Sequence, residues 1–520
     1  MQRIDASTLR DWFDDGHELA LLDAREEGEF GASHLFWAVP CPLSRRELRV
    51  RALLPRLGTR IVCIDAGNGL AERLADYLEG IGATDVSVLD RGVAAWATAG
   101  CVLFSGINVP SKAFGEWVEH HYGTESVDPP ELNRWLDDGR DLVVLDSRTY
   151  AEFQRMSIPR GISVPGGELA YRIGDLAPDP KTLVVVNCAG RTRSIMGAES
   201  LRQAGIPNRV VALRNGTMGW ELAGLTCERG RAERFSQGRP ATADLALARA
   251  KKFAERSGVG VIGPPELLAY AEDPDRTLYV LDVRDPEEFA EHHLAGSVNA
   301  PGGQLVQATD IWIGVRGARI ALIDDDGVRA RMSAAWLRQM GHRDVFVVEG
   351  GLEAAPIPVR PPVHAVLEPA PTMTAEELAP AEDVLVIDLA RSVDFRDGHI
   401  PGARWGIRSR LLALKSALAK ASAVVLTSPD GVLAKLAVPE VQSLTDAPVH
   451  VLDGGTAGWV AANYRLDHDR TNPPDDACVD VYLRPYDRNA GVEAAMRAYL
   501  AWEIDLVHEI ARDGTVHFGV

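Results

Sequence analysis

One short loop of the chain carries a thiol and two guanidinium groups side by side. It reads Cys-Ala-Gly-Arg-Thr-Arg-Ser and runs from Cys188 to Ser194. The thiolate is the nucleophilic form of cysteine, and positive charge from Arg191 and Arg193 would stabilise it or a bound anion. The loop therefore predicts a nucleophile, Cys188, inside an anion cradle built from Ala189, Gly190, Arg191, Thr192, Arg193 and Ser194.

The residues on either side of this loop predict a strand before it and a helix after it. Residues 182–187 are a β-branched run, and residues 194–204 are expected to be helical up to Gly205. The first N–H groups of a helix are unpaired and carry the positive end of its dipole, so they stabilise anions. Together these effects can lower a cysteine pKa from ~8.5 to roughly 3.5–7.5, which makes the thiolate the resting form. The alternative is a buried structural cysteine, but the flanking glycine and arginines favour the nucleophile.

The composition is that of a soluble globular protein with several domains. The 520 residues are enough for about three to five domains. The apolar fraction of 46% and the charged fraction of 25% are ordinary values. A net charge of −19 argues against general binding to nucleic acid or to an anionic membrane. We therefore expect neither among the partners, although a local basic site remains compatible with this charge.

The N-terminus and the cysteine pattern favour the cytoplasm. Residues 1–5 carry charge where a signal peptide needs an apolar segment, and no run approaches the ~18 apolar residues of a membrane span. The six cysteines form no Cys-x-x-Cys pair, so neither a disulfide framework nor a zinc site is expected. The prediction is a cytoplasmic protein that needs no metal or organic cofactor.

Four copies of one sequence unit follow each other along the chain. In each copy an apolar run ends in an aspartate, and in the first three an arginine follows two residues later. These aspartates are Asp23, Asp146, Asp282 and Asp388. The interval from the aspartate to the cysteine-loop position is equal in the first three copies and two residues shorter in the fourth. A glycine followed by a tryptophan closes copies one, two and four, so the set is a true internal repeat.

The alternation of short apolar strands with helices predicts an α/β fold. Each copy should be a parallel β/α unit of roughly 100 residues with helices on both faces of its sheet. The cysteine loop would then lie at the carboxyl edge of a strand, where open α/β sheets bind their ligands. We expect domains at residues 1–105, 124–229, 259–358 and 372–466, followed by a C-terminal tail at 467–520.

The segments between and after the copies carry their own patterns. Candidate connectors are residues 111–123, 230–258 and 356–371; the second predicts a helix over 241–256, and the proline-rich third an extended spacer. The tail spaces apolar side chains at helical intervals over residues 490–511. They are Val492, Ala495, Met496, Tyr499, Leu500, Ile504, Val507 and Ile510. This pattern predicts a helix that docks against a neighbouring domain or subunit.

The ordered landmarks resemble the rhodanese homology superfamily in four tandem copies. The resemblance rests on the Leu-Asp-x-Arg strand, the Glu-Phe and Ile-Pro-Gly segments, the cysteine loop and the closing Gly…Trp. It implies a five-stranded parallel sheet in each copy and transfer of sulfane sulfur through a cysteine persulfide on Cys188. It also implies that Asp146 and Arg148 support the site, although the same pair recurs in copies without the cysteine, which favours a structural role.

The length of the loop separates two chemistries within that superfamily. Cys188 and Arg193 form a Cys-x4-Arg loop, which resembles the sulfur-transfer members, whereas the related phosphatase loops are one residue longer. The resemblance implies a thiosulfate-type donor whose anionic end is held by the loop N–H groups, Arg191 and Arg193. Cyanide or a thiol would then accept the sulfur from Cys188. A phosphatase-like enzyme is the weaker alternative.

The other three copies lack the cysteine. At its position they carry Asp65, Asp324 and Ser428, which cannot form a persulfide. We expect these side chains to act as helix caps that accept hydrogen bonds from the N–H groups of their own loops. Copy three keeps an arginine, Arg329, which the neighbouring aspartates could neutralise. Copies one, three and four are therefore predicted to be inactive.

The sequence leaves two functional classes open. One is a sulfurtransferase with a small anionic donor and a thiol or cyanide acceptor. The other is a persulfide carrier or regulatory protein, in which the inactive copies form a docking platform and turnover is incidental. A homodimer is compatible with either class.

Overall fold

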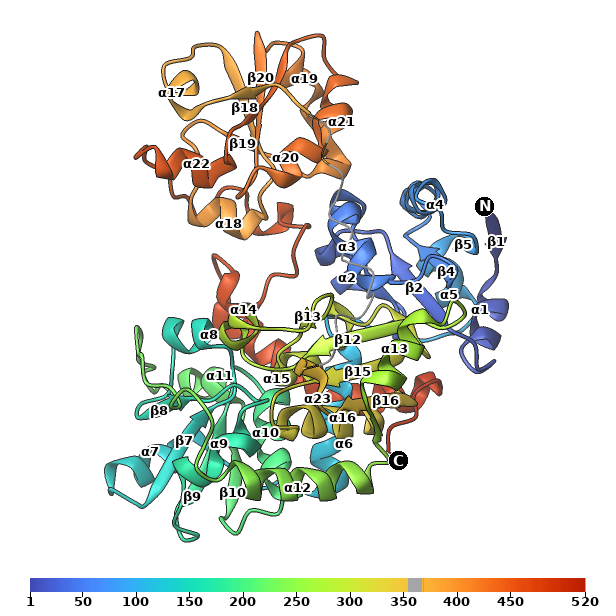
Figure 1. Ribbon diagram of the computed structural model, residues 1–520. Coiled ribbons are helices and arrows are strands. Elements are labelled where there is room, and N and C mark those ends of the chain that lie inside the picture. The colour runs from blue at the N-terminus through green and yellow to red at the C-terminus, as the bar shows by residue number, and fades with distance from the viewer. Residues whose placement is uncertain (354–366, 368, 520) are drawn as a thin grey trace.

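The computed structural model describes residues 1–353, 367 and 369–519, and it contains four β-sheets, each flanked by helices (Figure 1). We number the corresponding domains 1 to 4 in chain order. Domain 1 contains β1 (Gln2–Ile4), β2 (Leu19–Asp23), β3 (Val39–Pro40), β4 (Arg60–Ile64) and β5 (Val86–Leu89). Domain 2 contains β6 (Ser126–Val127), β7 (Leu142–Asp146), β8 (Gly161–Ser163), β9 (Leu183–Asn187) and β10 (Val210–Leu213). Domain 3 contains β11 (Gly260–Ile262), β12 (Leu278–Asp282), β13 (Val298–Asn299), β14 (Val315–Arg316), β15 (Arg319–Ile323) and β16 (Asp344–Val348). Domain 4 contains β17 (Thr372–Met373), β18 (Val384–Asp388), β19 (Arg404–Trp405), β20 (Ala423–Thr427) and β21 (Val449–Leu452).

The helices alternate with these strands, as the sequence predicts. Domain 1 has α1 (Ala6–Trp12), α2 (Glu27–Ala32), α3 (Arg46–Leu53), α4 (Leu70–Gly80) and α5 (Gly92–Thr98). Domain 2 has α7 (Pro129–Asp137), α8 (Tyr150–Arg155), α9 (Leu169–Leu176), α10 (Thr192–Gln203) and α11 (Gly216–Leu222). Domain 3 has α13 (Pro264–Glu272), α14 (Pro286–Glu291), α15 (Gly302–Gln307) and α16 (Val328–Gln339). Domain 4 has α17 (Ala375–Leu378), α18 (Ser392–Asp397), α19 (Lys415–Leu418), α20 (Val432–Leu436), α21 (Val438–Gln442) and α22 (Gly455–Ala461).

All four sheets share one parallel strand order, which confirms the predicted α/β class. In domain 2 the order is β6-β10-β9-β7-β8, and Asp146 at the end of β7 lies beside Asn187 at the end of β9. The central strands are buried on both faces, which explains their continuous Val and Leu runs. Crossover helices then leave the carboxyl edge of the sheet open for a site.

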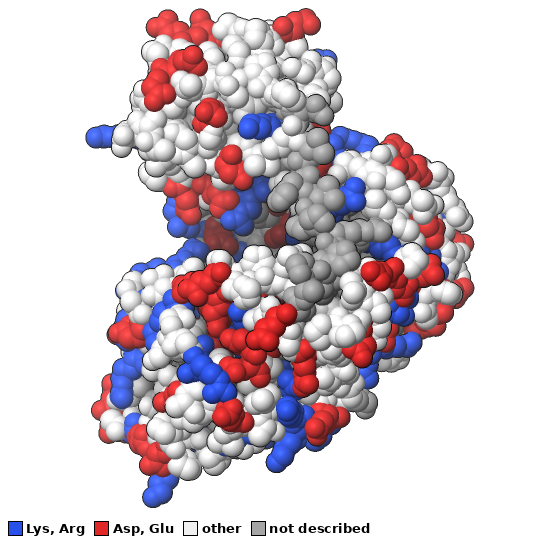
Figure 2. Space-filling view, in the orientation of Figure 1, with Lys and Arg blue, Asp and Glu red and all other residues white. Residues whose placement is uncertain are grey.

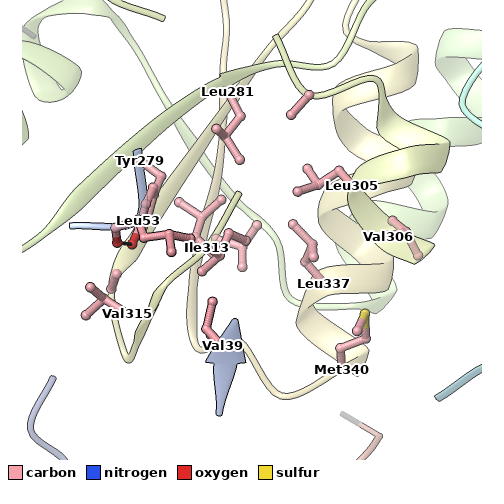
Figure 3. Close-up of a cluster of buried hydrophobic side chains, with 14 of the residues drawn as sticks. Val39, Leu53, Tyr279, Leu281, Leu305, Val306, Ile313, Val315, Leu337 and Met340 are labelled. Atoms are coloured by element: carbon pink, nitrogen blue, oxygen red, sulfur yellow. Dashed lines mark hydrogen bonds between the residues drawn. The ribbon is translucent and has the colours of Figure 1, made fainter. Parts of the chain in front are cut away.

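Domain 1 has a sixth strand that the sequence does not predict. β14, which belongs to domain 3 in sequence, pairs antiparallel with β2, through Val315 opposite Ala20 and Arg316 opposite Leu19. The two domains also share a core, in which Val39 and Leu53 of domain 1 pack among Leu281, Ile313 and other domain 3 side chains (Figure 3). The Tyr279 hydroxyl donates a hydrogen bond to the Leu53 carbonyl at 2.5 Å. Domains 1 and 3 therefore form one packed unit although domain 2 separates them in the chain.

The repeated motifs have structural roles that explain their recurrence. In domain 1, Arg25 donates to both carboxylate oxygens of Asp23 and to the Ser33 carbonyl. The pairs Asp146–Arg148 and Asp282–Arg284 are built in the same way. The tryptophan of the closing motif donates its indole N–H to a carbonyl six residues later, in Trp96, Trp220 and Trp459. Both motifs fix the fold of a copy and do not mark chemistry.

The connectors differ in how well the sequence predicts them. The expected helix at 241–256 is α12 (Ala243–Arg256), which confirms that prediction. The first connector is itself a helix, α6 (Val109–Tyr122), which the sequence does not predict. Most of the proline-rich segment at 356–371, with the expected end of domain 3 at 358, lies outside the described residues.

The tail helix predicted at 490–511 is α23 (Val492–Asp513), and it does dock within the chain. Its Leu506 and Ile510 pack against Val109 and Ala113 of α6. Met496 and Leu500 are buried as predicted, but Ile504 is exposed, and Glu503 faces the interior instead. Among the described residues, no helix combines the length and apolar character needed to cross a membrane.

Candidate active site

The cysteine loop joins β9 to α10 at the carboxyl edge of the domain 2 sheet. The helix begins at Thr192, two residues earlier than expected. The carbonyl groups of Cys188 and Ala189 accept hydrogen bonds from Thr217 and Met218, at 2.8 and 3.0 Å. Gly216 makes this approach possible, because it has a φ of +53° and a Cβ there would lie 2.2 Å from the Cys188 oxygen. The closing glycine of the repeat therefore holds the loop in place.

The thiol of Cys188 is nearly enclosed. Its exposed fraction is 2%, and its Sγ lies 3.5 Å from the hydroxyl oxygen of Ser194. Burial raises the pKa of Cys188, while the positive charge of Arg193 and the hydrogen bond with Ser194 oppose that effect. The nearby carboxylate of Glu503 raises the pKa further. The expected low-pKa thiolate is therefore wrong for this arrangement, because desolvation outweighs the charge of the loop.

Arg191 does not face an anion site, which contradicts the prediction made for it. Its guanidinium donates to both carboxylate oxygens of Glu116 at 2.8 Å and also pairs with Glu119, both on α6. Burial raises the pKa of Glu116 to about 6, against the opposing effect of the arginine. Arg191 therefore ties the loop to α6 and is neutralised there.

Arg193 does reach the open side of the loop. It forms a bidentate ion pair with Glu152 of α8, with both distances at 2.8 Å. Burial alone would raise the pKa of Glu152, but Arg193 and Arg148 outweigh it and hold the pKa well below its usual range. Arg193 also raises the fraction of Cys188 thiolate, so it is the loop arginine that acts on the thiol.

Asp146 and Arg148 support the edge of the sheet, as the structural interpretation predicts. Asp146 accepts hydrogen bonds from Arg148 and from the Asn187 amide at 2.8 Å, directly before the loop. Arg148 also donates to the carbonyl of Met156. The pair therefore fixes the strand ends that carry Cys188.

Residues of α6 and α23 form a wall of the site that the sequence does not predict. A Cβ added to Gly190 would lie 3.0 Å from a carboxylate oxygen of Glu503 and 3.4 Å from the Tyr499 ring, so α23 covers the loop closely. Glu503 accepts hydrogen bonds from Thr192 at 3.3 Å and from Lys112 at 2.9 Å. The amphipathic pattern of the tail predicts a docked helix, but nothing in the sequence identifies Glu503 as its buried acid.

A cavity of about 580 Å³ opens beside the loop, next to Ala189 and Arg193. Four parts of the chain line it. Domain 2 contributes Arg148 and Met218, domain 3 contributes Gln304, and α6 contributes Lys112. The segment after domain 4 contributes Tyr482 and further residues. The site is therefore a composite of several domains, although the cysteine belongs to domain 2.

The equivalent loops of the other domains are filled by their own side chains. The Asp65 carboxylate accepts hydrogen bonds from the N–H groups of Gly67 and Ala71, at 2.7 and 3.1 Å. In domain 3 Asp324 does the same, and in domain 4 the Ser428 hydroxyl accepts from one N–H group. The helix-cap positions themselves are glycines, which corrects one detail of the prediction. As predicted, these side chains therefore occupy the loop N–H groups that could otherwise bind an anion.

Arg329 of domain 3 is neutralised, as the sequence suggests, but by a wider set of acids. It is 1% exposed and pairs with Glu288 of α14 and with Asp325. It also pairs at 2.7 Å with Glu168 of domain 2, a partner that the sequence does not indicate. The domain 3 loop that corresponds to the cysteine loop is thus part of the interface with domain 2.

Comparison with known proteins agrees with this architecture. The family model described as rhodanese-like domain matches residues 5–99, 128–223, 264–355 and 373–462. A crystal structure of thiosulfate sulfurtransferase from Pseudomonas aeruginosa is 44% identical, has a TM-score of 0.93, and the match covers 100% of both chains. A sulfurtransferase of Allochromatium vinosum is 31% identical over 99 residues, which are 19% of this chain and 90% of that protein. An HTH-type transcriptional regulator of Mycobacterium tuberculosis is 32% identical over 107 residues, which are 20% of this chain and 46% of that protein.

Four α/β units, one of them with a cysteine loop at the carboxyl edge of its sheet, define a multidomain protein of the rhodanese type. The chain belongs to the rhodanese-like domain family. Within that family it is a sulfurtransferase.

Proposed function

We propose that the chain moves sulfane sulfur from thiosulfate, or a similar anionic donor, through a persulfide on Cys188 to cyanide or a thiol. One observation carries the proposal. Cys188 lies in the loop beside the 580 Å³ cavity, whereas the aspartates and the serine at the equivalent positions fill their own loops. The six cysteines, none of them in a disulfide, favour a reducing compartment such as the cytoplasm.

The reaction divides into two displacements. The Cys188 thiolate attacks the outer sulfur of thiosulfate, the sulfur–sulfur bond of the donor breaks, and sulfite leaves with the bonding electron pair. The acceptor then attacks the outer sulfur of the persulfide, and the Cys188 thiolate leaves. The N–H groups of the loop and Arg193 would hold the anionic end of the donor. Both loop arginines are ion-paired, Arg191 with Glu116 and Arg193 with Glu152, but only Arg193 lines the cavity. Such a scheme predicts ping-pong kinetics.

A persulfide carrier is the second candidate function, and the burial of Cys188 favours it. A thiol that is 2% exposed and has a raised pKa forms a thiolate less readily, which slows turnover. The same burial would protect a persulfide from oxidation and from adventitious thiols. The two candidates differ in rate and not in the covalent intermediate.

The decisive experiment compares the wild type with Cys188→Ser in steady-state assays. Thiosulfate and 3-mercaptopyruvate serve as donors, and cyanide and dithiols as acceptors. Cys227→Ser, a half-buried cysteine of the same domain, is the matched control and should keep full activity. The proposal fails if the wild type turns over no donor faster than Cys188→Ser. Persulfide formation without turnover would favour the carrier.

A further inference from the structure

The cavity beside Cys188 is strongly basic in an acidic protein. Its lining includes seven Lys and Arg side chains but only two carboxylates, Glu152 and Asp487. Three of the arginines have no carboxylate within 4.0 Å anywhere in the described part of the chain. They are Arg229, Arg470 and Arg484. Because the whole chain has a net charge of −19, this concentration of unneutralised positive charge points to an anionic ligand.

Two of these arginines, Arg470 and Arg484, also line a neighbouring cavity, whose other walls carry Glu27, Asp394 and Asp397. A second cavity of about 270 Å³ shares Arg155, Arg470, Tyr482, Arg484 and Asp487 with the first. The two cavities therefore meet at Arg470 and Arg484, and the second cavity is lined on its other side by domain 4 residues such as Arg396. Figure 2 shows Lys, Arg, Asp and Glu side chains along the hollow between domain 4 and the lower part of the molecule. The loop end of the first cavity, at Ala189 and Arg193, lies on the domain 2 side.

The size of the cavity exceeds what the donor alone requires. Sites for small organic molecules are typically about 300–1,000 Å³, and the cavity of about 580 Å³ falls in that range. A thiosulfate ion at the loop fills only a small part of it. The walls of the cavity are mixed, with Met156, Met218 and Tyr482 offering apolar surface beside the charged groups. Such a shape fits an extended molecule with an aliphatic body and negative charges at one end.

We propose that Arg470 and Arg484, with Arg229, recognise the carboxylates of an extended thiol that accepts sulfur from Cys188. This inference rests on the proposed function. The thiol end of the acceptor would lie at the loop and its carboxylates at the arginines. The acceptor thiolate attacks the outer sulfur of the persulfide, a new sulfur–sulfur bond forms on the acceptor, and the Cys188 thiolate leaves. One acceptor thiol thus becomes one acceptor persulfide, with no net oxidation.

The segment after domain 4 has a specificity role in this scheme. Arg470 and Arg484 belong to it, whereas the thiol belongs to domain 2. Neither arginine touches the loop through any hydrogen bond or ion pair among the described residues. Their replacement should therefore leave the loading of Cys188 intact and change only the choice of acceptor.

The experiment uses full-length protein and separates the two half-reactions. Cys188 is first loaded from thiosulfate, and loading is read as the mass of one added sulfur atom. The loaded protein is then mixed with glutathione, with its dimethyl ester, or with 2-mercaptoethanol, and the decay of the persulfide is followed. Glutathione is the carboxylate-bearing probe. Its dimethyl ester lacks both carboxylate charges and keeps the ammonium group, and 2-mercaptoethanol is small and neutral.

We expect the double variant Arg470→Gln/Arg484→Gln to raise the KM for glutathione by roughly tenfold or more, since charge-assisted hydrogen bonds are worth about 1.5–3 kcal/mol. The KM for 2-mercaptoethanol and the loading rate should stay within twofold. Arg465→Gln removes an exposed arginine at the end of domain 4, five residues before Arg470, that lines neither cavity, and it is the control.

Three results would overturn the inference. Equal KM values for glutathione in the wild type and the double variant would show that the arginines do not recognise the acceptor. An equal rise in the KM values for glutathione and 2-mercaptoethanol would indicate a structural effect of the substitutions. A higher KM for thiosulfate alone would assign the arginines to the donor. A failure of loading in the wild type would instead reject the proposed function itself.

Discussion

The guanidinium of Arg191 and the carboxylate of Glu116 share two hydrogen bonds of 2.8 Å, and this pair joins the cysteine loop to α6. The Glu116 side chain has no exposed surface, so its charge depends on this partner. Replacing Arg191 by glutamine would leave a buried carboxylate unpaired. We expect a loss of about 3–5 kcal/mol in the free energy of unfolding, measured by urea denaturation.

The matched control for that change is Glu119→Gln, which removes the more exposed partner of Arg191. It should cost no more than about 1 kcal/mol. The folded fraction of Arg191→Gln should keep its KM for thiosulfate. A large increase of this KM with unchanged stability would show that Arg191 binds the donor after all.

The charges around Cys188 predict opposite pH shifts in two variants. Arg193 lowers the pKa of the thiol and Glu503 raises it. Arg193→Gln should therefore move the pH profile of persulfide formation to higher pH, and the isosteric Glu503→Gln should move it to lower pH. In the wild type the rate should still increase above pH ~8.5, because the pKa of the buried thiol lies above that usual value.

Rapid-quench measurements of persulfide formation from thiosulfate, between neutral and alkaline pH, test these shifts. Ser428→Ala in domain 4 is the control, since it leaves the surroundings of Cys188 unchanged. Parallel shifts in Arg193→Gln and Glu503→Gln would contradict the assignment of their opposing effects.

The surroundings of Asp388 in domain 4 predict that replacing this aspartate will raise the free energy of unfolding. It lacks the arginine of the other copies, one of its oxygens has no hydrogen-bond partner among the described residues, and burial raises its pKa to about 6. The folded state binds this proton more tightly than the unfolded state, whose aspartate pKa is about 3.9. The free energy of unfolding therefore falls as the pH rises from about 4 to 6.

Asp388→Asn should remove the cost of burying the ionised carboxylate. The free energy of unfolding should therefore rise by an amount on the order of 1–3 kcal/mol above pH ~6 and stay unchanged near pH ~4. Thermal unfolding at both pH values measures the difference. Asp282→Asn in domain 3 is the contrasting variant, since it breaks the pair with Arg284 and should destabilise the protein. An equal gain from Asp388→Asn at both pH values would exclude titration as the cause.

Gly216 predicts a link between backbone geometry and activity. A Cβ at this position would lie 2.2 Å from the Cys188 oxygen, so Gly216→Ala must displace the loop. We expect a destabilisation on the order of 3 kcal/mol and loss of persulfide formation in the folded protein. Gly224→Ala is the matched control. Its φ is also positive, at +77°, but nothing lies within 4 Å, so it should cost about 1 kcal/mol and leave activity intact.

The sequence predicts each repeat well because the information is local. The strand β9, the loop after it and the docked helix α23 all follow from short patterns of residue type and spacing. The charges of the loop are less predictable. The main partner of Arg191, Glu116, belongs to a helix in a segment that reads as a connector, and only the folded chain brings the two together. The direction of the Cys188 pKa shift depends on the burial of the thiol in the folded chain, to which the charge of Glu503 on α23 adds, and neither can be predicted from the local sequence.

The same limit applies between domains. Nothing in the sequence of Val315 and Arg316 indicates that β14 pairs with β2 of domain 1 and not with the sheet of domain 3. The basic cavity is likewise assembled from residues that are far apart in the chain, so its positive charge cannot be recognised from the acidic overall composition.

The pairing of β14 with β2 has a consequence for synthesis on the ribosome. The open edge of β2 receives its last neighbour only when Arg316 has emerged, after the whole of domain 2 has been made. Until then the first domain has an exposed strand edge, which can pair with other chains and cause aggregation. Truncation before β14 should leave a protein that binds chaperones or precipitates, whereas a chain that includes β14 and the rest of domain 3 can close that edge.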